Sequence, residues 1–269
     1  MLKYHMFFFT KPISKPIKFR VVYEYTDDIL SQYHYTYTLQ LPDNQIQHFT
    51  YYIPQRPKIN AHSYHRFKLP HDTLNNWEIF GKNLVLTIDD SYNFEQTKRM
   101  YQLLREYNIT ATFFPNTIYI NPHNPEHLEL WRDIYNSGYE IGYHTTDHTR
   151  KRSVEELDRD FNAFTDIFRN ILQDQSFSIK SVRAPYGYFD RVWIKWVTDN
   201  NLLNMRWTMT ELEDMDYLRK LYYKQKGRVL LLHNRKGDVE WLRKNFNELI
   251  QIAKENGGKI GSIYDSIVR

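Results

Sequence analysis

The sequence contains no cysteine, so disulfide bonds and thiolate metal ligands are excluded. A bound metal ion would have to be held by histidine, aspartate or glutamate. Long apolar runs are missing as well: no stretch approaches the ~20 residues of a membrane-spanning helix, so we expect no transmembrane segment. The first residues, MLKYHMFFFT, lack the ~7–15-residue apolar core of a signal peptide. With no export signal visible, a cytoplasmic location is favoured.

A strong excess of one charge is also absent. The net charge is only +4, and lysine and arginine are scattered along the 269 residues. Their longest cluster, Arg150-Lys151-Arg152, fits a solvated helix entrance better than the clustered basic stripe of a nucleic-acid binder. We therefore expect no nucleic-acid partner. The 22 tyrosines allow stacking on carbohydrate, although packing is the more frequent role of aromatic residues.

The first 80 residues predict a small antiparallel β segment. Stretches rich in β-branched and aromatic residues, separated by short polar breaks, are expected strands at 17–25, 33–41 and 46–53. Residues 54–76 carry proline, histidine, asparagine and lysine with little periodicity, which indicates a connecting segment. We predict an N-terminal accessory region at 1–80 and a larger domain at 81–269.

From residue 82 onward, strand and helix patterns alternate. Residues 84–88, LVLTI, form an almost continuous apolar run, which is typical of a strand buried on both faces of a parallel sheet. One helix is expected to begin with a capping box of Ser153 and Glu156. Six further strands are predicted, at 110–114, 139–143, 179–185, 202–207, 228–233 and 259–263. Such alternation predicts an α/β fold with parallel strands, arranged as an open or incomplete barrel.

Polar side chains follow several of these strands at their carboxyl ends, where parallel α/β folds bind their ligands. The first strand ends in two aspartates, the third leads into two histidines, the fourth into an arginine, and the sixth ends in a histidine. The residues concerned are Asp89, Asp90, His144, His148, Arg183 and His233. Because one rim receives all of these groups, the sequence predicts a functional site there.

The motif HTTDH at 144–148 places two histidines four residues apart, a spacing that faces them the same way on a helical turn. Two imidazoles and one carboxylate are a frequent metal-ligand set that leaves one position open for water or substrate. The alternative is a pair of capping or surface histidines, which is more frequent for such a motif in isolation. The aspartate pair at a neighbouring strand end favours the metal interpretation.

Each remaining candidate has a structural alternative. Asp89 and Asp90 would point to opposite faces of a regular strand, but a turn could bring both to one site, as metal ligand and proton acceptor. They could instead cap the next helix. His233 could donate a proton to a leaving amine or be a hydrogen-bonded core residue. Arg183 could orient a carboxylate or form a structural salt bridge. Gly187 would let the backbone turn sharply.

Four segments occur in the order expected of one known family. TIDD at 87–90, HTTDH at 144–148, RAPYG at 183–187 and LLH at 231–233 resemble motifs of the polysaccharide deacetylases. This family is also called carbohydrate esterase family four or the nodulation-deacetylase homology domain. The resemblance covers about residues 82–269. It implies a distorted (β/α) barrel with seven or eight strands and the metal-dependent removal of acetyl groups from sugars.

The resemblance implies roles for the residues around the expected metal. Asp90, His144 and His148 would bind a divalent ion, usually zinc, with cobalt or nickel as alternatives. Asp89 would be the general base, and Arg183 would orient its carboxylate.

The resemblance also implies which residues meet the substrate, an acetylated sugar or glycan. The backbone N–H of Tyr186 would help to stabilise the tetrahedral oxyanion. His233 would protonate the departing amine, and Leu231 would line the pocket for the acetyl methyl group. Pro185 and Trp207 are expected at the substrate-binding surface.

Two features depart from the family pattern. Ser91-Tyr92 follows the aspartate pair, where the family usually has glycine and often proline; this changes the rim and leaves the ligands intact. The family's Asp-Trp motif after the fifth strand has no clear counterpart, although Trp207 lies near that place. Candidate acids for the support of His233 are Glu211, Glu213 and Asp214.

The leading hypothesis is a metal-dependent deacetylase that acts on an N-acetylated sugar or glycan. A second hypothesis keeps the site and changes the substrate, giving an amidase for a small amide or an O-acetyl esterase. A third is an inactive glycan-binding module. The N-terminal strands could bind sugar, cover the barrel or form an oligomer contact; the sequence does not predict the oligomeric state.

Overall fold

The computed structural model describes residues 18–24, 32–40, 46–54, 77–188, 190–212, 214–223 and 228–267. The chain divides into two compact units, Met1–Pro57 and Lys58–Arg269. Most of the predicted connecting segment lies outside the described residues. The predicted boundary at residue 80 stays a prediction.

The first unit contains the antiparallel β segment that the sequence predicts. Its strands are β1 (Lys18–Glu24), β2 (Gln32–Gln40) and β3 (Ile46–Pro54). They pair in sequence order, with Val21 opposite Tyr37 and Tyr37 opposite Phe49. Each strand lies within one or two residues of its predicted range.

The second unit is built on parallel strands around β4 (Leu84–Asp90). The six-stranded sheet has the order β6-β5-β4-β10-β9, and β11 also pairs with β4. Its other strands are β5 (Thr112–Pro115), β6 (Glu140–Ile141), β9 (Met209–Thr210), β10 (Val229–His233) and β11 (Ile260–Gly261). A separate pair, β7 (Ser181–Val182) with β8 (Leu203–Asn204), is connected to the rest by a bridge between Tyr143 and Val182. This open arrangement of parallel strands confirms the predicted fold class.

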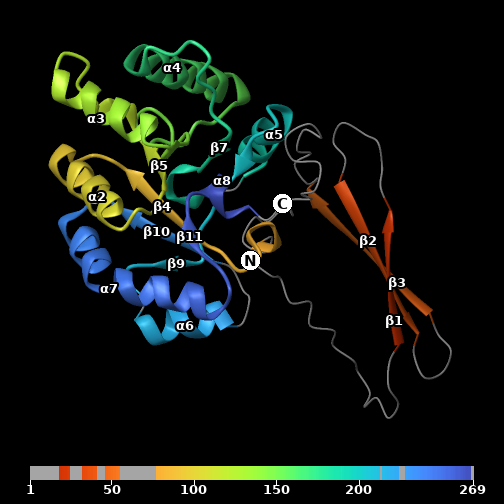
Figure 1. The fold of residues 1–269 in the computed structure, drawn as a ribbon. Helices are drawn as coiled ribbons and strands as arrows, with labels where there is room; N and C mark the ends of the chain where they lie inside the picture. Colours follow the sequence, from red (N-terminus) through yellow and green to blue (C-terminus); the bar gives the residue numbers. More distant parts are fainter. Residues whose placement is uncertain are drawn as a thin grey trace. The chain divides into compact units, whose positions relative to one another are not determined.

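Helices lie around the outside of these strands (Figure 1). Asn93 and Ser153 cap α2 and α4 by accepting backbone N–H groups with their side chains. The predicted capping box is incomplete, because the Glu156 carboxylate accepts the Arg152 N–H instead of that of Ser153. The helices are α2 (Phe94–Glu106), α3 (Pro125–Asn136), α4 (Val154–Leu172), α5 (Arg191–Asp199), α6 (Met215–Tyr223), α7 (Lys236–Glu255) and α8 (Ile263–Ser266).

The core lies on both faces of β4, as its apolar run predicts. Leu86 and Ile88 belong to the large cluster that packs against the helices. Val85 faces a smaller cluster with Phe114 and Val229. Burial on both faces keeps β4 in the middle of the sheet, and its last residues, the two aspartates, pair with His233, Phe114 and Pro115 at the ends of the neighbouring strands.

The strands differ from prediction chiefly in length. All seven predicted strands of the second unit are present, but several pair over only two residues before the chain turns into a loop. The two-residue strand β9 was not predicted, because so short a segment shows no periodicity. Among the described residues, no helix is long and apolar enough to cross a membrane.

Candidate active site

The two aspartates at the end of β4 reach the same histidine. The Oδ2 atom of Asp89 lies 3.6 Å, and the Oδ1 atom of Asp90 3.4 Å, from Nε2 of His144. This is achieved because Asp90 and Ser91 both adopt left-handed backbone conformations, with φ of 70° and 54°. The turn expected at the strand end is therefore present. Glycine adopts such a φ most readily, so Ser91 keeps the turn at some conformational cost.

The histidine loop, residues 144–148, is not a helical turn, and this part of the prediction is wrong. Thr145 and His148 adopt φ of 65° and 58°, whereas a right-handed helical turn requires negative φ. The loop nevertheless brings the rings together, with centroids 4.9 Å apart. The Asn116 amide donates to the carbonyl oxygens of His144 and Thr145 at 2.8 and 3.0 Å. The spacing of the motif therefore predicts proximity of the imidazoles, but not the conformation that produces it.

Asp90, His144 and His148 form a group that could hold a metal ion. One ligand atom from each lies within 4.8 Å of the others. Asp90 Oδ1 lies 3.4 Å from Nε2 of both histidines, yet it is buried and has no hydrogen-bond partner in the described part of the chain. One carboxylate and two imidazoles are a common donor set for zinc and related divalent ions, so these residues fit such an ion.

The electrostatics of this group favour an ionised carboxylate. Burial alone would raise the pKa of Asp90, but the adjacent His144 and the charge of His148 lower it below its ordinary value. Burial and the neighbouring His144 lower the pKa of His148. A neutral imidazole is the form that binds metals, so this shift also favours ligation.

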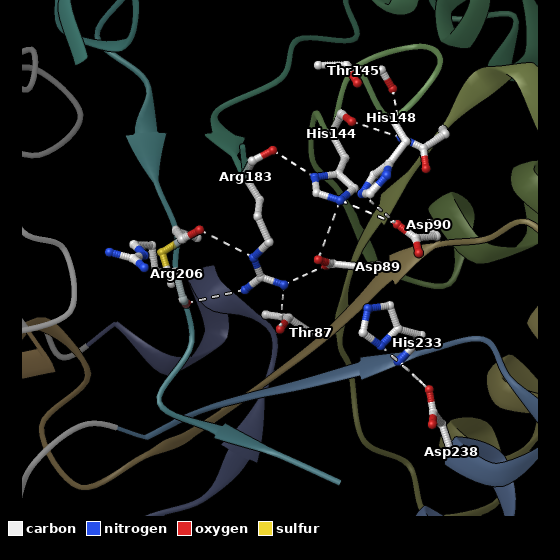
Figure 2. A network of polar contacts seen from close by, with 12 residues as sticks. Thr87, Asp89, Asp90, His144, Thr145, His148, Arg183, Arg206, His233 and Asp238 are labelled. Carbon is white, nitrogen blue, oxygen red and sulfur yellow. Dashed lines mark hydrogen bonds and ion pairs between the residues drawn. The ribbon is translucent and has the colours of Figure 1, made fainter. Parts of the chain in front are cut away.

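Arg183 links Asp89, the base candidate, to His144 (Figure 2). The side chain is fully buried, and its guanidinium donates to Asp89 Oδ1 at 2.5 Å and to Thr87 at 3.0 Å. Its backbone carbonyl lies 2.7 Å from Nδ1 of His144, which directs Nε2 toward Asp90. The sequence offered two roles for Arg183, a structural salt bridge or the orientation of a carboxylate. Its contact with Asp89 is a salt bridge that also orients the carboxylate.

His233 lies directly beside Asp89, since the two residues are partners in the parallel pairing of β10 with β4. Its backbone N–H donates to the Asp238 carboxylate at 2.7 Å, and its Nδ1 atom lies 3.8 Å from the same oxygen. Glu211 lies close to both residues. A carboxylate oxygen of Glu211 is within 4.8 Å of a ring nitrogen of His233 and of a carboxylate oxygen of Asp238. Burial raises the pKa of both carboxyl groups.

Asp238 is the residue that sequence reasoning missed. Its position could have indicated this role, because Asp238 lies five residues after His233, in the first turn of α7. Of the three acids considered, Glu211 lies at His233, and Asp214 instead accepts the Tyr217 N–H at the start of α6. Glu213 lies outside the described residues.

The remaining candidates surround these groups. Leu231 and Pro185 are buried, and Tyr186 is exposed, with its ring 4.4 Å from that of His148. Gly187 has a φ of 66°, and a Cβ atom there would lie 2.8 Å from the Trp207 ring. The turn after β7 therefore requires glycine both for its conformation and for the approach of Trp207.

The open α/β sheet thus places carboxylates and imidazoles at its strand ends, where parallel α/β folds bind their ligands. Residues 80–204 match the sequence model of the polysaccharide deacetylase family. The match covers a little under half of the chain and confirms the resemblance to this family.

This chain is also similar to several individual proteins. A peptidoglycan-N-acetylglucosamine deacetylase of Bacillus cereus is 26% identical over 130 residues, which are 48% of this chain and 46% of the relative. The matched region thus spans about half the length of that relative. A family 4 carbohydrate esterase from Bacillus anthracis has a similar fold, with a TM-score of 0.55, 23% identity, and coverage of 71% of this chain and 84% of that one. A pseudoenzyme of the same esterase family from Bacillus anthracis has a TM-score of 0.55, 21% identity, and coverage of 68% and 64%.

Proposed function

We propose that this protein is a metal-dependent hydrolase that removes acetyl groups, in particular N-acetyl groups, from a sugar or polysaccharide. One observation carries the proposal: Asp89 and Asp90 share the imidazole of His144, while Arg183 holds only the first of them. The two neighbouring carboxylates therefore have different surroundings, which separates a base from a ligand.

Asp90, His144 and His148 would hold the ion, and zinc suits this donor set, with cobalt or nickel as alternatives. When bound, a divalent ion of this kind lowers the pKa of water and polarises a carbonyl group. The unpartnered Oδ1 atom of Asp90 supports this assignment, because a buried carboxylate oxygen without a donor is costly unless a cation compensates it.

The other residues divide the proton transfers between them. Arg183 fixes one oxygen of Asp89 and leaves Oδ2 free to accept a proton from attacking water. The backbone N–H of Tyr186 stabilises the oxyanion that develops on the acetyl carbonyl. His233 donates a proton to the departing amine, and Asp238 fixes the backbone from which it extends. Leu231 would line the space for the acetyl methyl group.

A glycan is the substrate class that the surroundings support best. The curated relative acts on N-acetylglucosamine in peptidoglycan. Tyr92 packs edge-on against Tyr119, Tyr186 against Tyr188, and all four rings are exposed. Exposed tyrosines combine an apolar face with a hydroxyl, which suits a sugar ring with its polar substituents.

Acetate release tests the proposal most simply. Metal-loaded protein is offered N-acetylated and O-acetylated oligosaccharides, and cyclic and linear amides of no sugar character, beside Asp89→Asn. We expect release from the N-acetylated glycans, reduced by about 10²–10⁴-fold in the variant. Turnover only of O-acetyl groups or small amides would replace the substrate assignment. Glycan binding with no turnover under any supplied metal would favour a binding module.

We further propose an accessory role for the N-terminal unit, as a sugar-binding element, a cover or an oligomer contact. Removal of the first unit, Met1–Pro57, should alter turnover on long glycans or the mass of the assembly. Unchanged turnover and mass would refute all three roles.

A further inference from the structure

We propose that Asp160, on helix α4, is a positioning residue that keeps the histidine loop in its metal-binding conformation. The inference rests on the metal site of the proposed function, and it adds a residue that belongs to none of the four sequence motifs. Asp160 follows His148 by twelve residues and lies on α4, from which its side chain contacts Thr146 in the loop.

The Asp160 carboxylate accepts four contacts from the segment that contains the loop. Its Oδ2 atom accepts the Tyr143 hydroxyl at 2.7 Å and the Thr146 backbone N–H at 2.9 Å. Its Oδ1 atom accepts the Thr146 hydroxyl at 2.5 Å and lies 3.0 Å from Nζ of Lys151. These donors stand before, within and after the histidine loop. The side chain of Asp160 is only 9% exposed, so water competes little for these bonds.

The loop requires such an anchor because its backbone is unfavourable by itself. Thr145 is β-branched and still adopts a left-handed φ of 65°, and His148 adopts 58°. Asn116 donates to two carbonyl oxygens of the loop. Asp160 accepts the Thr146 N–H. The loop is therefore held both through its carbonyl oxygens and through a backbone N–H group.

Metal affinity should depend on this anchor. His144 stands between Tyr143 and Thr146, both of which Asp160 holds, so a relaxed loop would let its imidazole leave the position opposite Asp90. Loss of a group that orients metal ligands typically weakens metal binding about 10–100-fold. A plain salt bridge between Asp160 and Lys151 would have no such effect.

The test measures zinc affinity by competition with a chelating dye, for full-length wild type and Asp160→Asn. We expect the variant to bind zinc about 10–100-fold more weakly. Asp158→Asn is the matched control: Asp158 lies on the same helix and accepts the Trp196 indole N–H at 2.7 Å. The Asp158→Asn variant should be less stable than wild type but should bind zinc with the same affinity. Wild-type affinity in a folded Asp160→Asn would overturn the inference.

Two further measurements keep the inference testable. Thr146→Val removes only the hydroxyl contact and replaces Asp160→Asn if that variant does not fold; it should weaken zinc binding by a smaller factor. Hydrogen exchange at the Thr146 amide needs no metal, and we expect it to be faster in Asp160→Asn than in wild type. A wild type that binds no zinc would refute the proposed function, and unchanged exchange at Thr146 would refute the role of Asp160.

Discussion

The carbonyl oxygen of Arg183 lies 2.7 Å from Nδ1 of His144, although the side chain of Arg183 is engaged with Asp89. One residue thus orients a metal-ligand candidate through its backbone and a base candidate through its guanidinium. These two tasks can be separated by mutation, because a substitution changes the side chain and leaves the carbonyl in place.

Arg183→Lys should keep zinc binding and lose turnover. Lysine retains the charge but lacks the planar fork that contacts Asp89 and Thr87 together. A misplaced base of this kind costs about 10² in kcat. The measurement is kcat for acetate release beside zinc content per chain; a variant that lost zinc and turnover together would show that the tasks are not separate.

The exposed tyrosines should bind the glycan on both sides of the histidine loop. The Ile118 N–H donates to the Thr146 carbonyl beside Tyr119, and the Tyr186 ring touches that of His148. Tyr119→Ala and Tyr186→Ala should each raise KM for long oligosaccharides by about tenfold, equivalent to ~1.4 kcal/mol.

Tyr217→Ala provides the control for these variants, since Tyr217 is similarly exposed but lies on α6. Its KM should equal that of wild type. Equal effects in all three variants would mean that the tyrosines act through general stability rather than by contact with sugar.

Glu140 should make the stability of the fold depend on pH. Burial raises the pKa of Glu140 above 4.5, although Ser262, Thr112 and the Tyr264 N–H donate to the carboxyl group and oppose the shift. Its folded pKa exceeds its unfolded pKa, so its contribution to stability is present below about 4.5 and is lost as pH rises through the folded value.

Glu140→Gln should therefore flatten this part of the profile. Denaturation midpoints of wild type and variant are compared between about pH 4 and about pH 7. Their difference should change with pH, whereas the exposed Glu129→Gln should follow wild type throughout. A constant difference between wild type and Glu140→Gln would show that the ionisation of Glu140 does not affect stability in this range.

The fold could be predicted because its signals are local. Apolar runs such as 84–88 define buried strands, and parallel strands deliver their carboxyl ends to one edge. The four motifs predicted the groups at that edge, and the structure brings Asp89, Asp90, His144 and His148 together.

The rest depended on contacts distant in sequence. Spacing alone favoured a helical turn for the histidines, whereas Asn116 and Asp160 hold a loop with two left-handed residues. Asp238 was not predicted, because the family motif places a supporting acid after the fifth strand, whereas Asp238 lies in the first turn of α7. Tertiary hydrogen bonds of this kind leave no periodic trace in a sequence.

We propose that Asp90, His144 and His148 hold a divalent ion, and the decisive measurement is the metal content per chain. Purified wild type, His148→Ala and the control His123→Ala, a substitution in an exposed loop, are incubated with zinc, cobalt or nickel and analysed. We predict about one ion per chain in wild type and in the control, and a loss of that ion in His148→Ala. The absence of an ion from all three proteins, or its retention in His148→Ala, would contradict this assignment of ligands.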